Sequence, residues 1–278
     1  MSATIPTSSP IRTTPDTHPA RGHSRLVSTH LDITATHDEA DLAAVKAAPA
    51  LAPQAVTAAS AAERIIESTG ISVDTHSLKR GAWAKRTLDL FGSICGLIAL
   101  APVLAIIALI VKLDSRGPVF FRQTRVGLNG TEFSIVKFRT MSVGAEKQVD
   151  ALMALNEGAG PLFKIKEDPR ITRVGGVLRK LSLDELPQLF NVLGGSMSLV
   201  GPRPGLPREV EQYEPHAHGR LLVSPGITGL WQVSGRSDLE WSEGLRLDLH
   251  YVENRSLALD IKVLARTVPM VLGSRGAY

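Results

Sequence analysis

The chain has 278 residues, which is enough for one sizeable domain with additional segments. Its net charge of +4 suits anionic lipids or phosphorylated ligands but does not choose between them. The only cysteine, Cys95, excludes a disulfide framework or a cysteine-based zinc site within one chain and is typical of a reducing compartment.

The N-terminal segment, residues 1–77, is rich in Ala, Thr, Ser and Pro and poor in aromatic residues. Such a composition buries too little apolar surface to offset the entropy of an ordered chain. The segment also lacks the basic start and apolar core of a secretory signal. We therefore expect a disordered leader over residues 1–77, in which Gln54–Ser68 forms a helix only transiently.

An uninterrupted apolar run, Leu90–Val111, follows within the segment 78–113. At about 1.5 Å per helical residue it is long enough to cross a bilayer core. A proline inside a helix removes a hydrogen bond and clashes with the preceding turn, so we expect a break at Ala101 and Pro102. Basic residues flank the run on both sides, whereas a spanning helix usually carries them in excess on the cytoplasmic side. We therefore predict a broken, re-entrant membrane helix with both ends in the cytoplasm.

The segment 114–278 is predicted to be a compact, irregular cytoplasmic domain of the α/β class. Short apolar stretches around the turn at 127–130 predict a hairpin, and helical spacing predicts four helices. The strands are expected at 118–121 and 133–136, and the helices at 142–156, 183–193, 241–251 and 258–272. Between them, the Gly- and Pro-rich stretch 198–236 predicts little regular structure. The amphipathic segment 258–272 fits an interfacial helix on the bilayer and a core helix equally well.

The sharpest candidate for chemistry is the pair Asp184 and Glu185. One interpretation is structural, because Ser182 and Glu185 have the spacing of a capping box, in which the serine caps a helix and the glutamate reaches back. The other is functional, because Asp184, Gln188 and Asn191 form a polar stripe apart from the apolar one. Cations stand just before the pair, where they would help to bind an anion. Spacing alone favours the structural interpretation and leaves the functional one open.

Cations occur in several motifs that could bind phosphate. In the segment GPRPG, residues 201–205, two prolines restrict the backbone, so Arg203 is presented with little entropy to lose. Without other context this segment is equally an ordinary surface loop. Further candidate cations lie in VKFRTM, in LRKLSL and in PGITGLWQVSGR, and they are Lys137, Arg139, Arg179 and Arg236. Together these side chains favour a phosphate-rich ligand more than any one of them does.

Taken in order, these motifs resemble the bacterial sugar transferase family, the polyprenyl-phosphate phosphoglycosyl transferases of the small monotopic type. The resemblance covers residues 80–278 and rests on KRTLDL, GPVFFRQTRVG, VKFRTM, DPRITRVGGVLRKLSLDELPQLFNVLGGSMSLVGPRP, PGITGLWQVSGR and LDLHYV. Larger relatives carry spanning helices and a soluble module before the catalytic part. Residues 1–77 contain nothing comparable, so the chain resembles the minimal catalytic form preceded by a leader.

The resemblance implies transfer of a sugar-1-phosphate from a UDP-sugar to undecaprenyl phosphate, with release of UMP. Asp184 would be the nucleophile and form an aspartyl-phosphosugar intermediate, and Glu185 would help to hold Mg²⁺. The nucleotide and its phosphates would contact the cations named above, Lys137, Arg139, Arg179, Arg203 and Arg236. The sugar itself cannot be read from the residues, because epimers differ by one hydroxyl group.

The resemblance also implies a location at the inner membrane, with the catalytic domain on the cytoplasmic side. The sequence leaves open whether the protein forms a homo-oligomer. Lys85 and Arg86 would lie at headgroup level, where their charges favour the lipid phosphate. The alternative is a membrane-tethered binder of nucleotides or nucleic acid without catalysis. We do not expect nucleic acid as a partner, since that function predicts a basic patch with interleaved aromatics and only 5% of the residues are aromatic. An aspartyl-phosphate phosphatase would need a DxDxT-like motif, which the sequence lacks.

Overall fold

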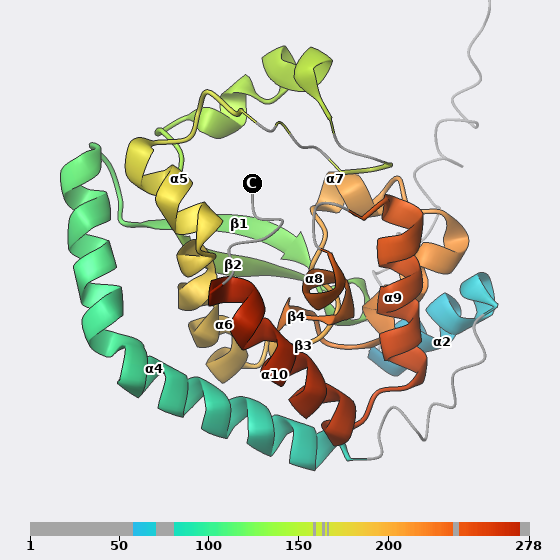
Figure 1. Ribbon diagram of the computed structural model, residues 1–278. Coiled ribbons are helices and arrows are strands. Elements are labelled where there is room, and N and C mark those ends of the chain that lie inside the picture. The colour runs from blue at the N-terminus through green and yellow to red at the C-terminus, as the bar shows by residue number, and fades with distance from the viewer. Residues whose placement is uncertain are drawn as a thin grey trace, which may run out of the picture. The chain divides into compact units, whose positions relative to one another are not determined.

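The computed structural model describes residues 58–70, 81–157, 160–162, 165, 167–235 and 239–272. All of them belong to one unit of the chain, Pro53–Tyr278. Figure 1 shows two small sheets at the centre of this unit, with helices around them. The mixture of short strands and helices agrees with the predicted α/β class.

Helix α2, Ala58–Thr69, lies where the sequence predicts a transient helix. Its Ala62, Ile65 and Ile66 pack against a buried cluster, so this segment contributes to the core. The buried members of that cluster come from the later part of the chain and are Val200, Leu222, Val223, Leu230, Tyr251, Val252 and Val263. Residues 1–57 and 71–77 of the expected leader lie outside the described residues, and its boundary at residue 77 stays a prediction.

Helix α4, Ala82–Asp114, contains the whole apolar run and Pro102. The helix is not interrupted at the expected break, because helical structure continues through Ala101 and Pro102. Both residues are exposed. Figure 1 shows instead that the two halves of α4 run in different directions, as a proline inside a helix causes. In the part of the chain that the structure describes, α4 alone is long and apolar enough to cross a membrane.

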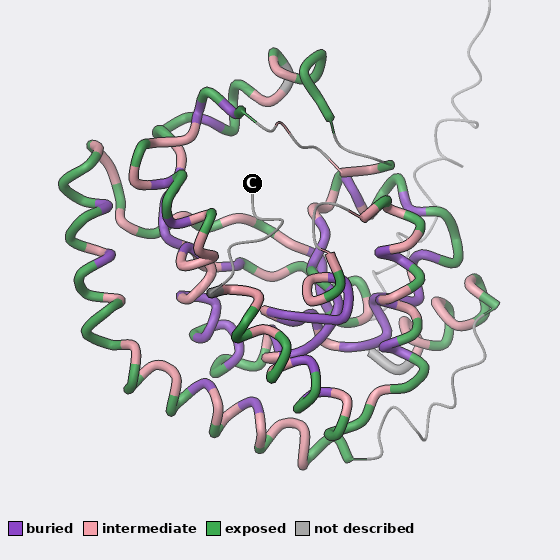
Figure 2. The backbone as a smooth tube through the Cα atoms, in the orientation of Figure 1, coloured by how far each residue is buried: buried purple, intermediate pink, exposed green. Residues whose placement is uncertain are grey.

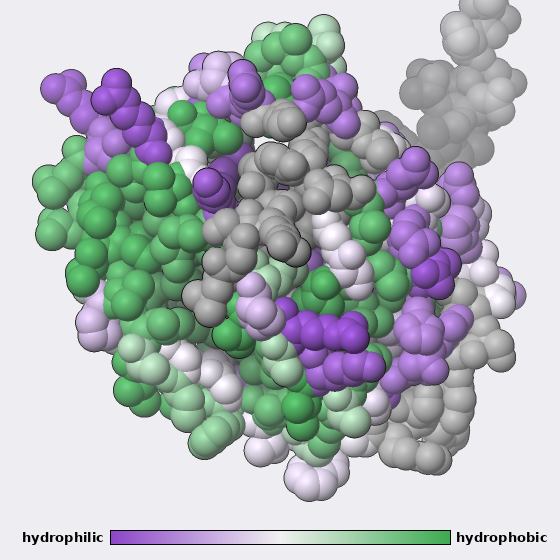
Figure 3. Space-filling model, in the orientation of Figure 1, coloured by the Kyte–Doolittle hydropathy of each residue, from purple (hydrophilic) through white to green (hydrophobic). Residues whose placement is uncertain are grey.

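Most of the surface of α4 is apolar and unburied. Figure 2 shows exposed and intermediate residues along nearly its whole length, and Figure 3 shows a hydrophobic surface over its second half. The large exposed side chains are Trp83, Phe91, Ile94, Ile98, Val103, Ile106, Leu109, Ile110 and Leu113. A surface of this extent is unusual for a helix in water and is typical of contact with a bilayer.

The predicted hairpin is confirmed and is longer than expected. Strand β1, Phe120–Val126, pairs antiparallel with β2, Glu132–Phe138, in a register that places Phe121 opposite Lys137. The 3₁₀ turn Leu128–Gly130 connects them, with Asn129 in the left-handed region at φ 55°. Since β2 contains Lys137 and leads directly to Arg139, the hairpin determines where these two cations lie.

The expectation of little regular structure over residues 198–236 is wrong, because this stretch contains several short elements. They are β3 (Ser198–Val200), α7 (Pro207–Val210), η5 (Pro215–Leu222), β4 (Gly226–Thr228) and α8 (Leu230–Ser234). Strands β3 and β4 pair in parallel. Strands of three residues are too short to show an alternating pattern, which is why the sequence did not predict them.

All four predicted helical segments are helical, but two of them are partly or wholly 3₁₀ helices. Residues 142–156 form two 3₁₀ helices, η2 (Ala145–Gln148) and η3 (Asp150–Leu155), in place of one α-helix. The predicted helix at 183–193 begins as the 3₁₀ helix η4, Leu183–Gln188, and continues as α6, Leu189–Gly194. Pro187, which lacks an N–H to donate within an α-helical first turn, lies inside the 3₁₀ part. The predicted helices at 241–251 and 258–272 are α9 (Trp241–Glu253) and α10 (Leu257–Leu272). Helix α5 (Arg173–Lys180) was not predicted.

Helix α10 has features of both alternatives that the sequence left open, an interfacial helix and a core helix. Asp260 and Val263 are buried, whereas Leu257, Ile261 and Val268 are exposed. One face therefore belongs to the core, and the opposite face is apolar and accessible. A second core cluster joins the end of α4 to β2 and α5 through Ile107, Val111, Phe138 and Leu178, with Leu183 and Leu186 of η4 packed against it. These two leucines fix the segment that carries Asp184 and Glu185.

Candidate active site

The acidic pair lies in the first turn of the 3₁₀ helix η4, which follows a strained residue. Ser182 has φ 54° and ψ 21°, a left-handed conformation that is uncommon for a residue with a side chain. Its side chain makes no capping hydrogen bond, so the capping box expected from Ser182 and Glu185 is wrong. The Glu185 side chain instead reaches across to cations on other segments. Strain of this kind is found at functional sites, where surrounding contacts hold it in place.

Glu185 joins three parts of the chain at one oxygen atom. Its Oε1 accepts a hydrogen bond from Lys137 Nζ of β2 and another from Arg203 Nη1 of the Pro-Arg-Pro loop, each at 2.9 Å. Burial alone would raise the pKa of the Glu185 carboxyl, but the charges of Arg203 and Lys137 hold it well below its usual range. The other carboxylate oxygen, Oε2, takes part in neither bond.

Asp184 has a different environment from its neighbour. The residue is buried, and burial together with the negative charge of Glu185 raises the pKa of Asp184 to about 6. Nearby positive charges oppose this shift, and they belong to Lys137, Arg179 and Arg203. Two adjacent carboxyl groups thus have pKa values displaced in opposite directions, which is typical of sites where such groups have separate chemical tasks.

The structure gathers three of the predicted phosphate-binding cations around this pair. Lys137 comes from β2, Arg179 from the last turn of α5, and Arg203 from the loop after β3. Burial lowers the pKa of both Lys137 and Arg179, and the nearby carboxylates act in the opposite direction. Arg203 is the most accessible of the three, with 44% of its side chain exposed. Three cations around a buried carboxyl group suit a phosphorylated ligand.

Arg139 does not join this cluster. Its guanidinium donates to the carbonyl oxygens of Val111, Ser115, Arg116 and Pro118 and to the Ser115 hydroxyl, at distances of 2.6 to 3.4 Å. The side chain therefore provides hydrogen bonds for carbonyl groups in the last turn of α4 and just after it, where helical partners are lacking. The strand alternation that places Lys137 and Arg139 on one face could not reveal this role. Arg236, the remaining predicted contact, lies outside the described residues.

Lys85 and Arg86 are likewise engaged within the protein. Lys85 Nζ lies 3.0 Å from the buried carboxylate of Asp260 and donates to the Val200 carbonyl. Arg86 donates to the carbonyl oxygens of Val192 and Leu193, at 2.6 and 2.8 Å. The expectation that their charges face lipid phosphate is therefore wrong. Both side chains attach the start of α4 to the domain that holds the acidic pair.

Two residues near the site were missed or only partly recognised from the sequence. Arg125 at the end of β1 donates from Nη1 to the Pro204 carbonyl, next to Arg203, and only its basic character within QTRVG pointed to it. Asn191 was recognised as part of a polar stripe. Its amide donates to the Ser134 carbonyl and its Oδ1 accepts from the Val136 N–H, so it attaches α6 to β2.

The chain is similar to a known protein family and to several named proteins. The bacterial sugar transferase family matches residues 80–274. The exopolysaccharide production protein ExoY of Sinorhizobium fredii is 43% identical over 202 residues, which cover 71% of this chain and 89% of that protein. The undecaprenyl-phosphate galactose phosphotransferase of Salmonella typhimurium is 42% identical over 75% of this chain and 44% of its own length. The undecaprenyl-phosphate glucose phosphotransferase of Komagataeibacter xylinus is 43% identical over 70% and 37%. The chain therefore belongs to the bacterial sugar transferase family.

Proposed function

We propose that the protein transfers a sugar-1-phosphate from a UDP-sugar to undecaprenyl phosphate, as an early membrane step in exopolysaccharide or O-antigen synthesis. The observation that carries this proposal is the position of Asp184, buried beside Glu185 and surrounded by Lys137, Arg179 and Arg203. The names of the relatives support it, since those proteins are undecaprenyl-phosphate galactose and glucose phosphotransferases. Another relative, from Xanthomonas campestris, is named as a UDP-glucose:undecaprenyl-phosphate glucose-1-phosphate transferase.

In the proposed first step, an oxygen of the Asp184 carboxylate attacks the phosphorus that bears the sugar. The bond from this phosphorus to the oxygen bridging the two phosphates breaks, and UMP leaves with that oxygen. In the second step, a phosphate oxygen of undecaprenyl phosphate attacks the same phosphorus, and the Asp184 carboxylate is released. With a pKa of about 6, Asp184 is mostly ionised at neutral pH and needs no general base.

The three cations would bind the non-bridging phosphate oxygens and offset the charge that develops during transfer. Arg203 and Arg179 can each present two parallel N–H groups to a phosphate, whereas Lys137 acts as a compact charge. Because the three cations come from three separate parts of the chain, they would fix the position of the phosphorus with respect to Asp184.

The residues are compatible with Mg²⁺ when the donor is bound. Within the described residues, His, Cys, Asp and Glu form no group of three or more that could hold a metal ion. Mg²⁺ often uses only one or two carboxylates and takes its other ligands from water and substrate phosphates. Glu185, with Oε2 outside both of its hydrogen bonds, would be the protein ligand, together with the donor's diphosphate. When bound, Mg²⁺ would neutralise phosphate charge at this point.

Helix α4 would bring this site to the membrane surface, where a soluble sugar nucleotide and a lipid phosphate can meet. Both halves of α4 contact the same domain, which supports a re-entrant path. Asp89 near its start accepts hydrogen bonds from Ser198 and Leu199, and Val111 near its end belongs to a cluster with Phe138. A helix that left the domain behind in order to cross the bilayer could not keep both sets of contacts.

The proposal is tested by incubating membranes that contain the protein with undecaprenyl phosphate and a panel of UDP-sugars, with UMP release as the readout. With donor alone, UMP should appear once per enzyme, and the peptide that contains Asp184 should gain the mass of a sugar phosphate. Asp184→Asn should abolish both signals, whereas Glu253→Gln, at an exposed carboxyl group, should leave them unchanged. Near-normal turnover by Asp184→Asn would remove Asp184 from the role of nucleophile. No UMP release by the wild type from any UDP-sugar would overturn the donor class.

A further inference from the structure

The Pro-Arg-Pro segment, residues 202–204, is held in place through its backbone carbonyl groups. A proline has no backbone N–H, so Pro202 and Pro204 can be fixed by backbone hydrogen bonds only through their oxygens. Each of the three carbonyls accepts a hydrogen bond from a different part of the chain. The donors, in order, are the Gly226 N–H, Arg220 Nη2 and Arg125 Nη1, at 2.9, 3.0 and 3.1 Å. Two of these donors are therefore arginine side chains, Arg220 from η5 and Arg125 from β1.

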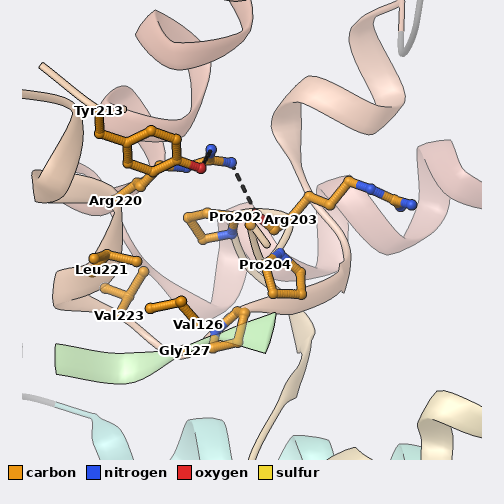
Figure 4. A pocket seen from close by; sticks show the side chains of 11 residues that line it. Val126, Gly127, Pro202, Arg203, Pro204, Tyr213, Arg220, Leu221 and Val223 are labelled. Atoms are coloured by element: carbon orange, nitrogen blue, oxygen red, sulfur yellow. Dashed lines mark hydrogen bonds between the residues drawn. The ribbon is translucent and has the colours of Figure 1, made fainter. Parts of the chain in front are cut away.

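Arg220, the donor to the Arg203 carbonyl, is one of the most constrained cations in the described part of the chain. The residue is 4% exposed, and its Nη1 donates to the Tyr213 hydroxyl at 2.8 Å (Figure 4). Its Nη2 also donates to the buried carboxylate of Asp248. Three aromatic rings enclose the guanidinium, with centroids 5.4 to 5.7 Å away, and they belong to Tyr213, Trp231 and Trp241. Hydrogen bonds and ring contacts together leave this guanidinium a single orientation.

Arg203 itself connects this buried cluster to the acidic pair. Its carbonyl oxygen faces Arg220, whereas Figure 4 shows its side chain pointing away from the pocket that Arg220 and Tyr213 line. The guanidinium at the other end reaches Glu185 Oε1. The backbone position of Arg203 therefore determines where an accessible, otherwise flexible side chain enters the site.

We propose that Arg220 and Arg125 are positioning residues for Arg203, and that they act by holding the Arg203 and Pro204 carbonyls. This inference rests on the proposed function, in which Arg203 binds the transferring phosphoryl group. The prolines restrict the loop conformation, but they do not set its position with respect to Glu185. Donors anchored in the core supply that position, so less freedom of Arg203 is lost when the phosphate arrives.

The test is a double-mutant cycle on turnover. Arg220→Lys keeps the positive charge but lacks the planar fork that serves Tyr213, Asp248 and the Arg203 carbonyl together. It should lower kcat on the order of 10²-fold, as small displacements of positioning groups do. Arg203→Lys should lower kcat similarly, and the double variant should lose little more than Arg203→Lys alone. Losses that multiply fully in the double variant, or unchanged turnover in Arg220→Lys, would overturn the inference.

Folding and the proposed function are checked separately. Arg246→Lys, at an exposed arginine that pairs with Glu243, is the matched control and should leave kcat unchanged. Circular dichroism and thermal unfolding show whether Arg220→Lys folds. If it does not, Arg125→Lys enters the same cycle, because Arg125 holds the adjacent carbonyl, and the same criterion of non-multiplying losses decides.

A readout that does not need turnover separates failure of this inference from failure of the proposed function. Phenylglyoxal labelling of Arg203, located by peptide mass spectrometry, should be several-fold faster in Arg220→Lys or Arg125→Lys than in the wild type. The reason is that a displaced Arg203 no longer stays paired with Glu185. Equal labelling rates would overturn the inference even if the wild type released no UMP.

Discussion

Glu185 Oε1 and Arg203 Nη1 lie 2.9 Å apart, although the two residues are 18 positions apart in the sequence and belong to different segments. Lys137 Nζ reaches the same oxygen from β2. The carboxylate therefore has a tertiary role in place of the local one that its spacing from Ser182 predicts. Charge-assisted bonds to two cations are stronger than the single N-cap contact that a capping box would provide.

Glu185→Gln is expected to keep the fold and to weaken the response to Mg²⁺. The amide cannot carry the charge that a divalent cation requires, so the Mg²⁺ concentration for half-maximal activity should rise by about 10-fold or more. The measurement is UMP release as Mg²⁺ is varied, with Glu243→Gln, at an exposed glutamate, as the control. An unchanged Mg²⁺ dependence would leave Glu185 only as the partner of Lys137 and Arg203.

Replacement by lysine should affect stability at Arg139 and turnover at Arg179. Lysine at position 139 cannot serve the several carbonyls at the end of α4, so the free energy of unfolding should fall by about 1–3 kcal/mol while KM for the donor stays unchanged. Arg179→Lys should retain stability and lower turnover, because Arg179 interacts with Asp184. Denaturant unfolding in detergent and initial rates distinguish them. An Arg139→Lys variant with normal stability and a raised KM would restore Arg139 as a substrate contact.

The fold was predictable from the sequence where a pattern is long or a turn is explicit. The apolar run gave α4, and the Gly-Leu-Asn-Gly turn gave the β1–β2 hairpin with strands on both sides. Strands β3 and β4 were missed because each has three residues and pairs with a segment far along the chain. The pairing also depends on the close approach of Gly201 and Gly226 in the folded chain. A Cβ atom on Gly226 would lie 2.1 Å from the Gly201 backbone nitrogen, so only glycine fits there.

The candidate site was predictable as a set of residue types, but the partners of each residue were not. Lys137, Arg179 and Arg203 could be chosen because separate motifs each offered a positive charge that suits phosphate, whereas the role of Asp184 was implied by the family resemblance. The sequence could not distinguish Arg139 from Lys137, which lies two positions before it, because the direction of a long side chain depends on tertiary neighbours. For the same reason Arg220 and Arg125 went unnoticed, since their role is defined by carbonyl groups that every residue carries.

Asp168→Asn should reduce stability in a pH-dependent manner. The Asp168 carboxylate accepts hydrogen bonds from Arg170 Nε and Nη2, and these bonds lower its pKa despite burial. A group whose pKa is lowered by folding stabilises the protein above its unfolded pKa of about 3.9, and this stabilisation is lost as the pH falls through the folded value. The free energy of unfolding of the wild type should therefore exceed that of Asp168→Asn by about 2 kcal/mol at pH 7. The difference should become progressively smaller below about pH 4.

Denaturant unfolding at several pH values measures this difference, with Glu243→Gln as the control. Glu243 pairs with Arg246 at the surface, so its replacement should change stability by less than about 1 kcal/mol at every pH. A difference for Asp168→Asn that stays constant down to pH 3 would show that the native ion pair with Arg170 is not its cause.

Pro102→Ala should change the path of α4 through the membrane. Alanine restores the missing hydrogen bond and removes the clash with the preceding turn, so the two halves of α4 should align and favour spanning. In the wild type, Asp89 and Val111 both contact the same domain. A straight helix could not keep both contacts, so activity should fall. The measurement uses Thr75→Cys and Asp150→Cys, each in a Cys95→Ala background, with a membrane-impermeant thiol reagent applied from either side. With Pro102 present, both labels should react only from the cytoplasm, and with alanine the two labels should react from opposite sides. Labels on opposite sides with Pro102 present would make α4 an ordinary spanning helix.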